Sequence, residues 1–126
     1  ILCLKRAVRS MYQDHRYLLN SEKIYSEEKE KINEILRTDE NEVDLQYSIN
    51  ALSEYLNRHF DKPVILIVDE YDVPLQHAYV KGYYNEAIDF FKTFYGTTFK
   101  DNPYLEKTVI TGVSRVAKES IFSRSK

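Results

Sequence analysis

The chain has 126 residues, and its 18 Lys and Arg against 20 Asp and Glu give a formal net charge of −2. This length fits one domain, and a hydrophobic share of 43% is enough to bury a core, so composition excludes wholesale disorder. The nearly neutral balance gives no support to a global electrostatic grip on nucleic acid or on an anionic membrane. We therefore expect nucleic acid to be involved only indirectly.

Cysteine content and apolar runs restrict the setting further. The single cysteine, Cys3, excludes an internal disulfide framework and a cysteine-rich zinc site, which favours a reducing compartment and hence the cytoplasm. No apolar run approaches the roughly 20 residues that a membrane-spanning helix needs. The chain begins at Ile1 without an initiator methionine and stops where a helical pattern starts, so we expect a piece of a longer protein.

The first half of the chain reads as helices. Apolar residues near helical spacing predict a helix over residues 3 to 19. Ser21 or Ser26 can cap a second helix, whose first turn carries glutamates that suit its amide end. Asn41 can cap a third helix, which has the most regular apolar face in the sequence. That face consists of Leu45, Ile49, Leu52, Leu56 and Phe60.

The pattern changes after Phe60. Asp61-Lys62-Pro63 ends the helix, and five consecutive branched apolar residues follow at 64–68. Such a run predicts a strand buried on both faces of a parallel sheet. Pro74 predicts an irregular stretch after it. A further helix follows Gly82 and ends at Gly96 or at residues 101–103.

A second strand-like run covers residues 108–113, and Ser114-Arg115 follows at its carboxyl end. Residues 117 to 123 then predict the start of a last helix. The sequence thus predicts an α/β fold that is mostly helical, with two short parallel strands.

The first strand ends in two neighbouring acids, Asp69 and Glu70. A buried strand fixes such carboxylates at the sheet edge where ligands bind in open α/β folds. The first acid can hold Mg²⁺, and the second can orient or deprotonate the water that attacks a γ-phosphate, as in a Walker B strand. The alternative is a buried strand followed by an ordinary polar turn.

The second strand ends in Thr111-Gly112-Val113-Ser114-Arg115. Arg115 could neutralise charge that develops on a transferred phosphate, and Ser114 or Thr111 could donate hydrogen bonds to it. The alternative is a strand that runs out into a loop with an exposed arginine.

Four stretches in this order make the chain resemble the bacterial AAA-ATPase-like family of P-loop NTPases, in which the ATPase domain often precedes a PD-(D/E)xK-type nuclease domain. The resemblance implies ATP and Mg²⁺ as cofactors, with Asp69 on the metal, Glu70 on the water, and Ser114, Arg115 and Thr111 at the γ-phosphate. It also implies a nucleotide as partner and a fused nuclease-type domain. The matching stretches are residues 63–72, 83–91, 100–105 and 111–123.

The phosphate-binding loop of that family has no counterpart in this sequence. Residues 1–60 contain no glycine, so no G-x-x-x-x-G-K-[ST] motif is present there. We therefore expect a single partial domain over residues 1–126, with a helical segment 1–60 and a segment 61–126 that carries the acids and the sensor-like strand end. It should be inactive alone. The strand between the two predicted ones should be missing, which predicts marginal stability or self-association unless those two pair directly.

Two other functions stay open from the sequence. The helical first half could present a surface in a non-catalytic interaction module, with the acids as structural caps. A metal-dependent nuclease could be built on Asp69, Glu70 and Asp72, although the lysine of the nuclease pattern is not nearby. We expect Tyr71 to be a packed aromatic and Asp72 to cap the loop before Pro74.

Overall fold

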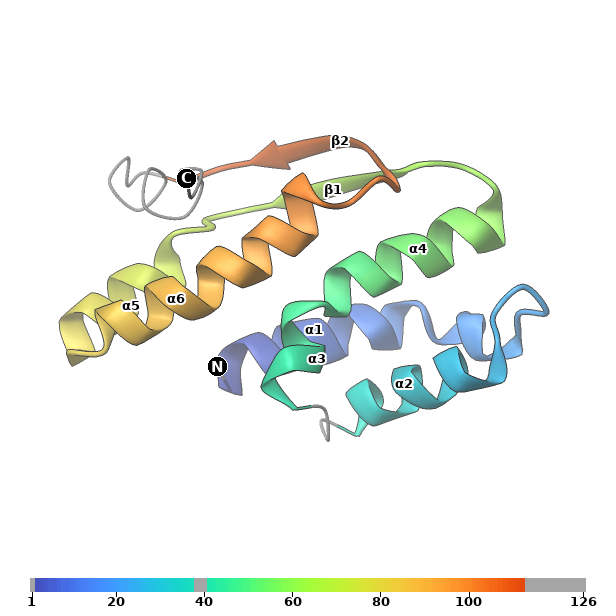
Figure 1. The fold of residues 1–126 in the computed structure, drawn as a ribbon, viewed down its shortest axis with the longest axis horizontal. Coiled ribbons are helices and arrows are strands. Elements are labelled where there is room, and N and C mark those ends of the chain that lie inside the picture. The colour runs from blue at the N-terminus through green and yellow to red at the C-terminus, as the bar shows by residue number, and fades with distance from the viewer. Residues whose placement is uncertain (1, 38–40, 113–126) are drawn as a thin grey trace.

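The computed structural model describes residues 2–37 and 41–112 of the chain. Figure 1 shows the two strands together along one side, next to α4 and α6, with α1 and α2 on the opposite side. The elements follow in chain order as α1 Leu2–Asp14, the 3₁₀ turn η1 Arg16–Asn20, α2 Ser26–Leu36, α3 Glu42–Gln46, α4 Ser48–Phe60, β1 Val64–Val68, α5 Val73–Lys81, α6 Tyr84–Tyr95, the π-helical turn η2 Gly96–Lys100 and β2 Leu105–Ile110.

The helical first half agrees with the apolar spacing, with three differences. The helix predicted over residues 3 to 19 is an α-helix only to Asp14 and continues as the turn η1, and Tyr25, not Ser21 or Ser26, is the N-cap residue of α2. The Asn41 side chain accepts a hydrogen bond from the Asp44 amide at 2.8 Å, so the predicted cap is confirmed. The predicted third helix is divided, because Tyr47 leaves the helical backbone region between α3 and α4. Apolar spacing reports which face is buried, and both pieces bury theirs, so the pattern could not locate this break.

A partly buried ion cluster joins α2 to α4. The Arg58 guanidinium lies 2.5 Å from Glu28 and 2.7 Å from Glu54. It also stacks over the ring of Tyr25, 5.1 Å from its centroid. The Glu28 carboxylate additionally accepts the Tyr25 amide at 2.9 Å, which satisfies a donor at the start of α2. The cluster therefore fixes the amide end of α2 against the last turns of α4.

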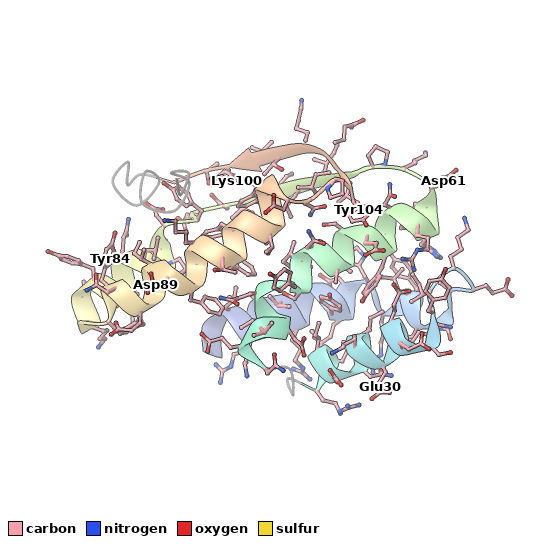
Figure 2. The ribbon with its side chains drawn as sticks, in the orientation of Figure 1. Glu30, Asp61, Tyr84, Asp89, Lys100 and Tyr104 are labelled. Carbon is pink, nitrogen blue, oxygen red and sulfur yellow. The ribbon has the colours of Figure 1, made fainter. Side chains whose placement is uncertain are left out.

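The turn from α4 into β1 forms as the sequence predicts. Asp61 adopts a left-handed backbone with φ of 55° and ends α4, and Pro63 follows it. Figure 2 shows Asp61 at this end of the molecule, with Tyr104 nearby at the start of β2. The Val64 amide donates to the Tyr104 carbonyl at 2.8 Å, which begins the pairing of the two strands.

The two strands are direct neighbours in a parallel sheet, from Val64 opposite Leu105 to Val68 opposite Ile110. No strand lies between them in the described residues, as expected, and the alternative that the two strands pair directly is confirmed. The crossover α5–α6 is long enough to return the chain beside β1, as parallel pairing requires. β2 begins earlier than predicted, at Leu105, because its first residues pair with the start of β1.

The prediction that β1 is buried on both faces is wrong. Leu66 is 9% exposed and packs in the core, whereas Ile65 and Ile67 are 55% and 69% exposed. Successive residues of a strand point to opposite faces, and the described helices cover one face of the sheet. A continuous apolar run indicates potential for burial on both sides, and here one side stays open to solvent.

The prediction of an irregular stretch after Pro74 fails for a local reason. α5 begins at Val73, and Pro74 lies in its first turn, where the amide that proline lacks would have no helical partner. Gly82 ends α5 with φ of 86°, a left-handed conformation that glycine adopts without steric cost. The helix predicted to begin at residues 117–123 lies outside the described residues.

Candidate functional site

The carboxyl end of β1 carries the predicted acids. The buried side chain of Leu66 anchors the strand, and Asp69 and Glu70 follow Val68 directly as exposed residues. β2 ends two residues before Gly112, at the same edge of the sheet, because the strands are parallel. The two segments that the sequence singles out thus meet where open α/β folds bind ligands.

Thr111 joins the two strand ends through both its backbone and its side chain. Its amide donates to the Val68 carbonyl at 2.9 Å, and its carbonyl accepts the Tyr71 amide at 2.9 Å. Its hydroxyl accepts the Glu70 amide at 3.0 Å and donates to the Asp69 carboxylate. Because a hydroxyl has one proton to donate, these two bonds fix its orientation. The structure thereby brings Asp69, Glu70 and Thr111 together.

Glu70 has an unusual backbone. Its φ of 54° lies in the left-handed region, which a residue with a Cβ adopts at a cost of about 1–3 kcal/mol. The hydrogen bond from its amide to Thr111 and that from the Val73 amide to its carbonyl, at 3.1 Å, maintain this conformation. The chain consequently turns sharply at the second acid, immediately after the strand.

Tyr71 is 4% exposed, so the prediction of a packed aromatic is confirmed. Its carbonyl accepts the Tyr95 hydroxyl at 2.8 Å, and the two rings meet edge to face with centroids 6.3 Å apart. Burial, with the charge of Asp72, raises the pKa of Tyr71. The turn after Glu70 is therefore seated in the core against α6.

Asp72 is 1% exposed and stands at the amino end of α5. Its backbone carbonyl accepts the Leu75 and Gln76 amides, and its carboxylate accepts the Gln76 side-chain amide at 3.0 Å. The carboxylate makes no capping bond to the helix backbone, so the predicted capping role of this side chain is not confirmed. The Asp72 carboxylate is thus buried and hydrogen-bonded within the fold, whereas Asp69 is exposed.

Sequence reasoning missed two residues of this region, Tyr95 and Gly112. A Cβ at Gly112 would lie 2.2 Å from Cε1 of Tyr71 and 2.9 Å from a carboxylate oxygen of Asp72. A glycine directly after a strand, in a chain with three glycines, is a signal that could have indicated this close approach. Nothing in the sequence pairs Tyr95 with Tyr71, since the aromatic cluster of α6 looks uniformly like core.

Two of the predicted site residues, Ser114 and Arg115, lie outside the described residues. Within residues 2–37 and 41–112, no three His, Cys, Asp or Glu side chains gather as a group able to hold a metal ion. Asp69 therefore offers one exposed carboxylate beside a hydroxyl. This donor set fits Mg²⁺, which keeps several waters and takes one or two carboxylates together with phosphate oxygens. It does not fit an all-protein metal cage.

In the described part of the chain, no helix combines the length and apolar character that crossing a bilayer requires.

No curated protein and no solved structure matches the chain at a significant level. The family model described as a predicted AAA-ATPase matches residues 5–122. Since this match covers almost the whole chain and includes both strand ends, the chain belongs to the AAA-ATPase-like family.

Proposed function

We propose that this chain supplies the acidic and sensor side of an ATP-hydrolysing site. In this proposal β1 is the Walker B strand, Asp69 binds Mg²⁺ with its coordinated water, and Glu70 orients and deprotonates the attacking water. Mg²⁺ would supply charge neutralisation at the phosphates. The observation that carries the proposal is the set of hydrogen bonds by which Thr111 fixes Asp69 and Glu70 at the carboxyl edge of the sheet.

The segment that follows β2 contributes the sensor in this proposal. Thr111 stands beside the acids, and Ser114 and Arg115 follow it within a few residues. The arginine would stabilise the charge that develops on the γ-phosphate, and the hydroxyl of Ser114 would donate a hydrogen bond to it. Support comes from the family match and from the position of Thr111 against Asp69.

No glycine of this sequence begins a G-x-x-x-x-G-K-[ST] motif. In this proposal the phosphate-binding loop is therefore supplied from outside this sequence. We therefore expect this chain alone to be inactive and the full-length protein to be a cytoplasmic, Mg²⁺-dependent ATPase. A fused nuclease-type domain would be its effector.

The test is ATP turnover by the full-length protein that contains these residues. We expect Glu70→Gln to abolish turnover and leave ATP binding intact, because the amide cannot accept the proton of the water. Glu106→Gln is the matched control, an exposed acid on β2 that should change neither property. Equal turnover with Gln at position 70 would refute the catalytic role. Absence of nucleotide binding by the wild type would favour the non-catalytic interaction module.

A further inference from the structure

The Tyr95 hydroxyl donates a buried hydrogen bond to the backbone of the acidic turn. Tyr95 is the last residue of α6 and is 5% exposed, and its hydroxyl lies 2.8 Å from the Tyr71 carbonyl oxygen. Tyr71 is the residue directly after Glu70. The end of α6 therefore contacts the main chain one residue beyond the proposed catalytic acid.

Tyr71 is fixed from two sides. Its amide donates to the Thr111 carbonyl at 2.9 Å, and its ring lies so close to Gly112 that a Cβ there would overlap it. Its carbonyl is held by Tyr95. β2 thus holds the amide of Tyr71, and α6 holds the carbonyl. These contacts restrain the peptide that follows the left-handed backbone of Glu70, whose φ is 54°.

The left-handed conformation needs such restraint, because it is disfavoured for glutamate. If the Tyr71 carbonyl were released, the turn could relax, and rotation about the Glu70 backbone would move its Cβ and carboxylate away from their positions. Burial, together with the charge of Asp72, raises the pKa of Tyr95 above its ordinary value. The hydroxyl therefore stays protonated and remains a donor at physiological pH.

We infer that Tyr95 is a positioning residue for Glu70: its hydroxyl, through the Tyr71 carbonyl, keeps the second acid in the orientation that water activation requires. This inference rests on the proposed function for its catalytic consequence. It assigns to α6 a role in the site that the family match does not describe.

Tyr95→Phe in the full-length protein tests the inference, because it removes the hydroxyl and keeps the ring. The matched control is Tyr12→Phe, since the Tyr12 hydroxyl is equally buried and donates to the Ser48 carbonyl at 2.5 Å, in the helical half of the chain. We expect Tyr95→Phe to lower kcat for ATP about tenfold, with KM within about twofold. Tyr12→Phe should leave kcat unchanged.

A second measurement on the 126-residue chain is independent of turnover. We expect Tyr95→Phe to accelerate hydrogen exchange at the Glu70 and Tyr71 amides more than Tyr12→Phe does, at matched global stability. Unchanged kcat, or exchange at these amides equal in both variants, would overturn the inference. A wild-type protein without turnover would refute the proposed function, and the exchange measurement would still decide whether Tyr95 restrains the turn.

Discussion

Gly112 and Tyr71 approach so closely that a methyl group on Gly112 would lie 2.2 Å from Cε1 and 2.4 Å from Cδ1 of the tyrosine ring. The residue after Thr111 therefore has to lack a side chain for the ring to occupy its buried position. Because the ring belongs to the residue after Glu70, the shape of the acidic turn depends on a glycine that follows the neighbouring strand.

Gly112→Ala should therefore destabilise the chain. The added methyl group cannot fit unless the Tyr71 ring moves, and overpacking of this kind costs about 1–3 kcal/mol. The free energy of unfolding, measured by urea titration, should fall by that amount. Gly96→Ala is the control, because no atom lies within 4 Å of its added Cβ and its backbone is helical. That control should be neutral or stabilising by about 0.5–1 kcal/mol.

Thr111→Val should separate the hydrogen bonds of the Thr111 hydroxyl from those of its backbone. Valine keeps the shape and the backbone bonds, but the Glu70 amide loses its acceptor and the Asp69 carboxylate loses a donor. We expect the free energy of unfolding to fall by roughly 1 kcal/mol, and Mg²⁺-dependent ATP turnover of the full-length protein to fall strongly.

Thr108→Val, within β2, is the control for the change of residue type and should leave turnover at the wild-type level. Full turnover with valine at position 111 would contradict the proposed arrangement of the two strand ends.

The Arg58 cluster predicts a loss of stability in acid. Burial opposes ionisation of Glu28, but the hydrogen bonds from Arg58 and from the Tyr25 amide, with the guanidinium charge, lower its pKa below the ordinary 4.5. A depressed folded-state pKa contributes stability that is fully present above the unfolded value and is lost as pH falls through the folded one. The free energy of unfolding should therefore decrease below about pH 4.5.

Glu28→Gln should remove this part of the acid dependence and cost roughly 1–2 kcal/mol at pH 7, because the guanidinium loses its charged acceptor. Chemical denaturation at a series of pH values is the measurement. Glu30→Gln is the control, since Glu30 pairs with Arg37 at 3.6 Å across exposed side chains, and its removal should change little. A variant at position 28 that keeps the wild-type pH profile would contradict the assignment.

Within the described residues β1 pairs on one edge only, with β2, and its Ile65 and Ile67 are exposed, which predicts self-association of the isolated chain. Val64-Ile65-Leu66-Ile67-Val68 reads the same in both directions, so two copies related by a two-fold axis could pair β1 antiparallel with Ile65 opposite Ile67. An open groove of about 240 Å³ beside this strand could receive side chains of the second copy.

We expect analytical ultracentrifugation to detect dimers, and Ile67→Lys to abolish them. Val80→Lys, on the exposed surface of α5, should leave the dimer intact and so controls for added charge. Detection of monomers alone at every concentration would contradict this prediction.

The meeting of the two strand ends at one sheet edge is predictable because it depends on residue order. A strand at 64–68 places Asp69 and Glu70 at a sheet edge, and parallel pairing brings the end of the second strand to the same edge. The contact between Asp69 and Thr111 follows from these two facts. What lay beyond prediction depends on packing between segments distant in sequence, such as the Tyr95 hydroxyl reaching the Tyr71 carbonyl.

The errors have the same origin. A run of five apolar residues does not reveal how many helices cover a sheet, so it predicts burial of Ile65 and Ile67, which the structure exposes. Pro74 predicts a helix break, although the effect of a proline depends on whether it falls within the first helical turn. The left-handed backbone of Glu70 has no sequence signal either, since glutamate is not a residue type that favours it.

The hydrogen bonds of Thr111 also bear on the order of folding, because the bond to Val68 connects residues 43 positions apart. Closing so long a loop has an entropic cost that is recovered only when contacts across it form. The hairpin of α5 and α6 consists of local contacts and can form early, whereas the sheet edge must await the return of the chain. The acidic turn should therefore acquire its native geometry among the last parts of the molecule. Conditions that slow strand docking should delay the ability to bind a ligand at this turn more than they delay helix formation.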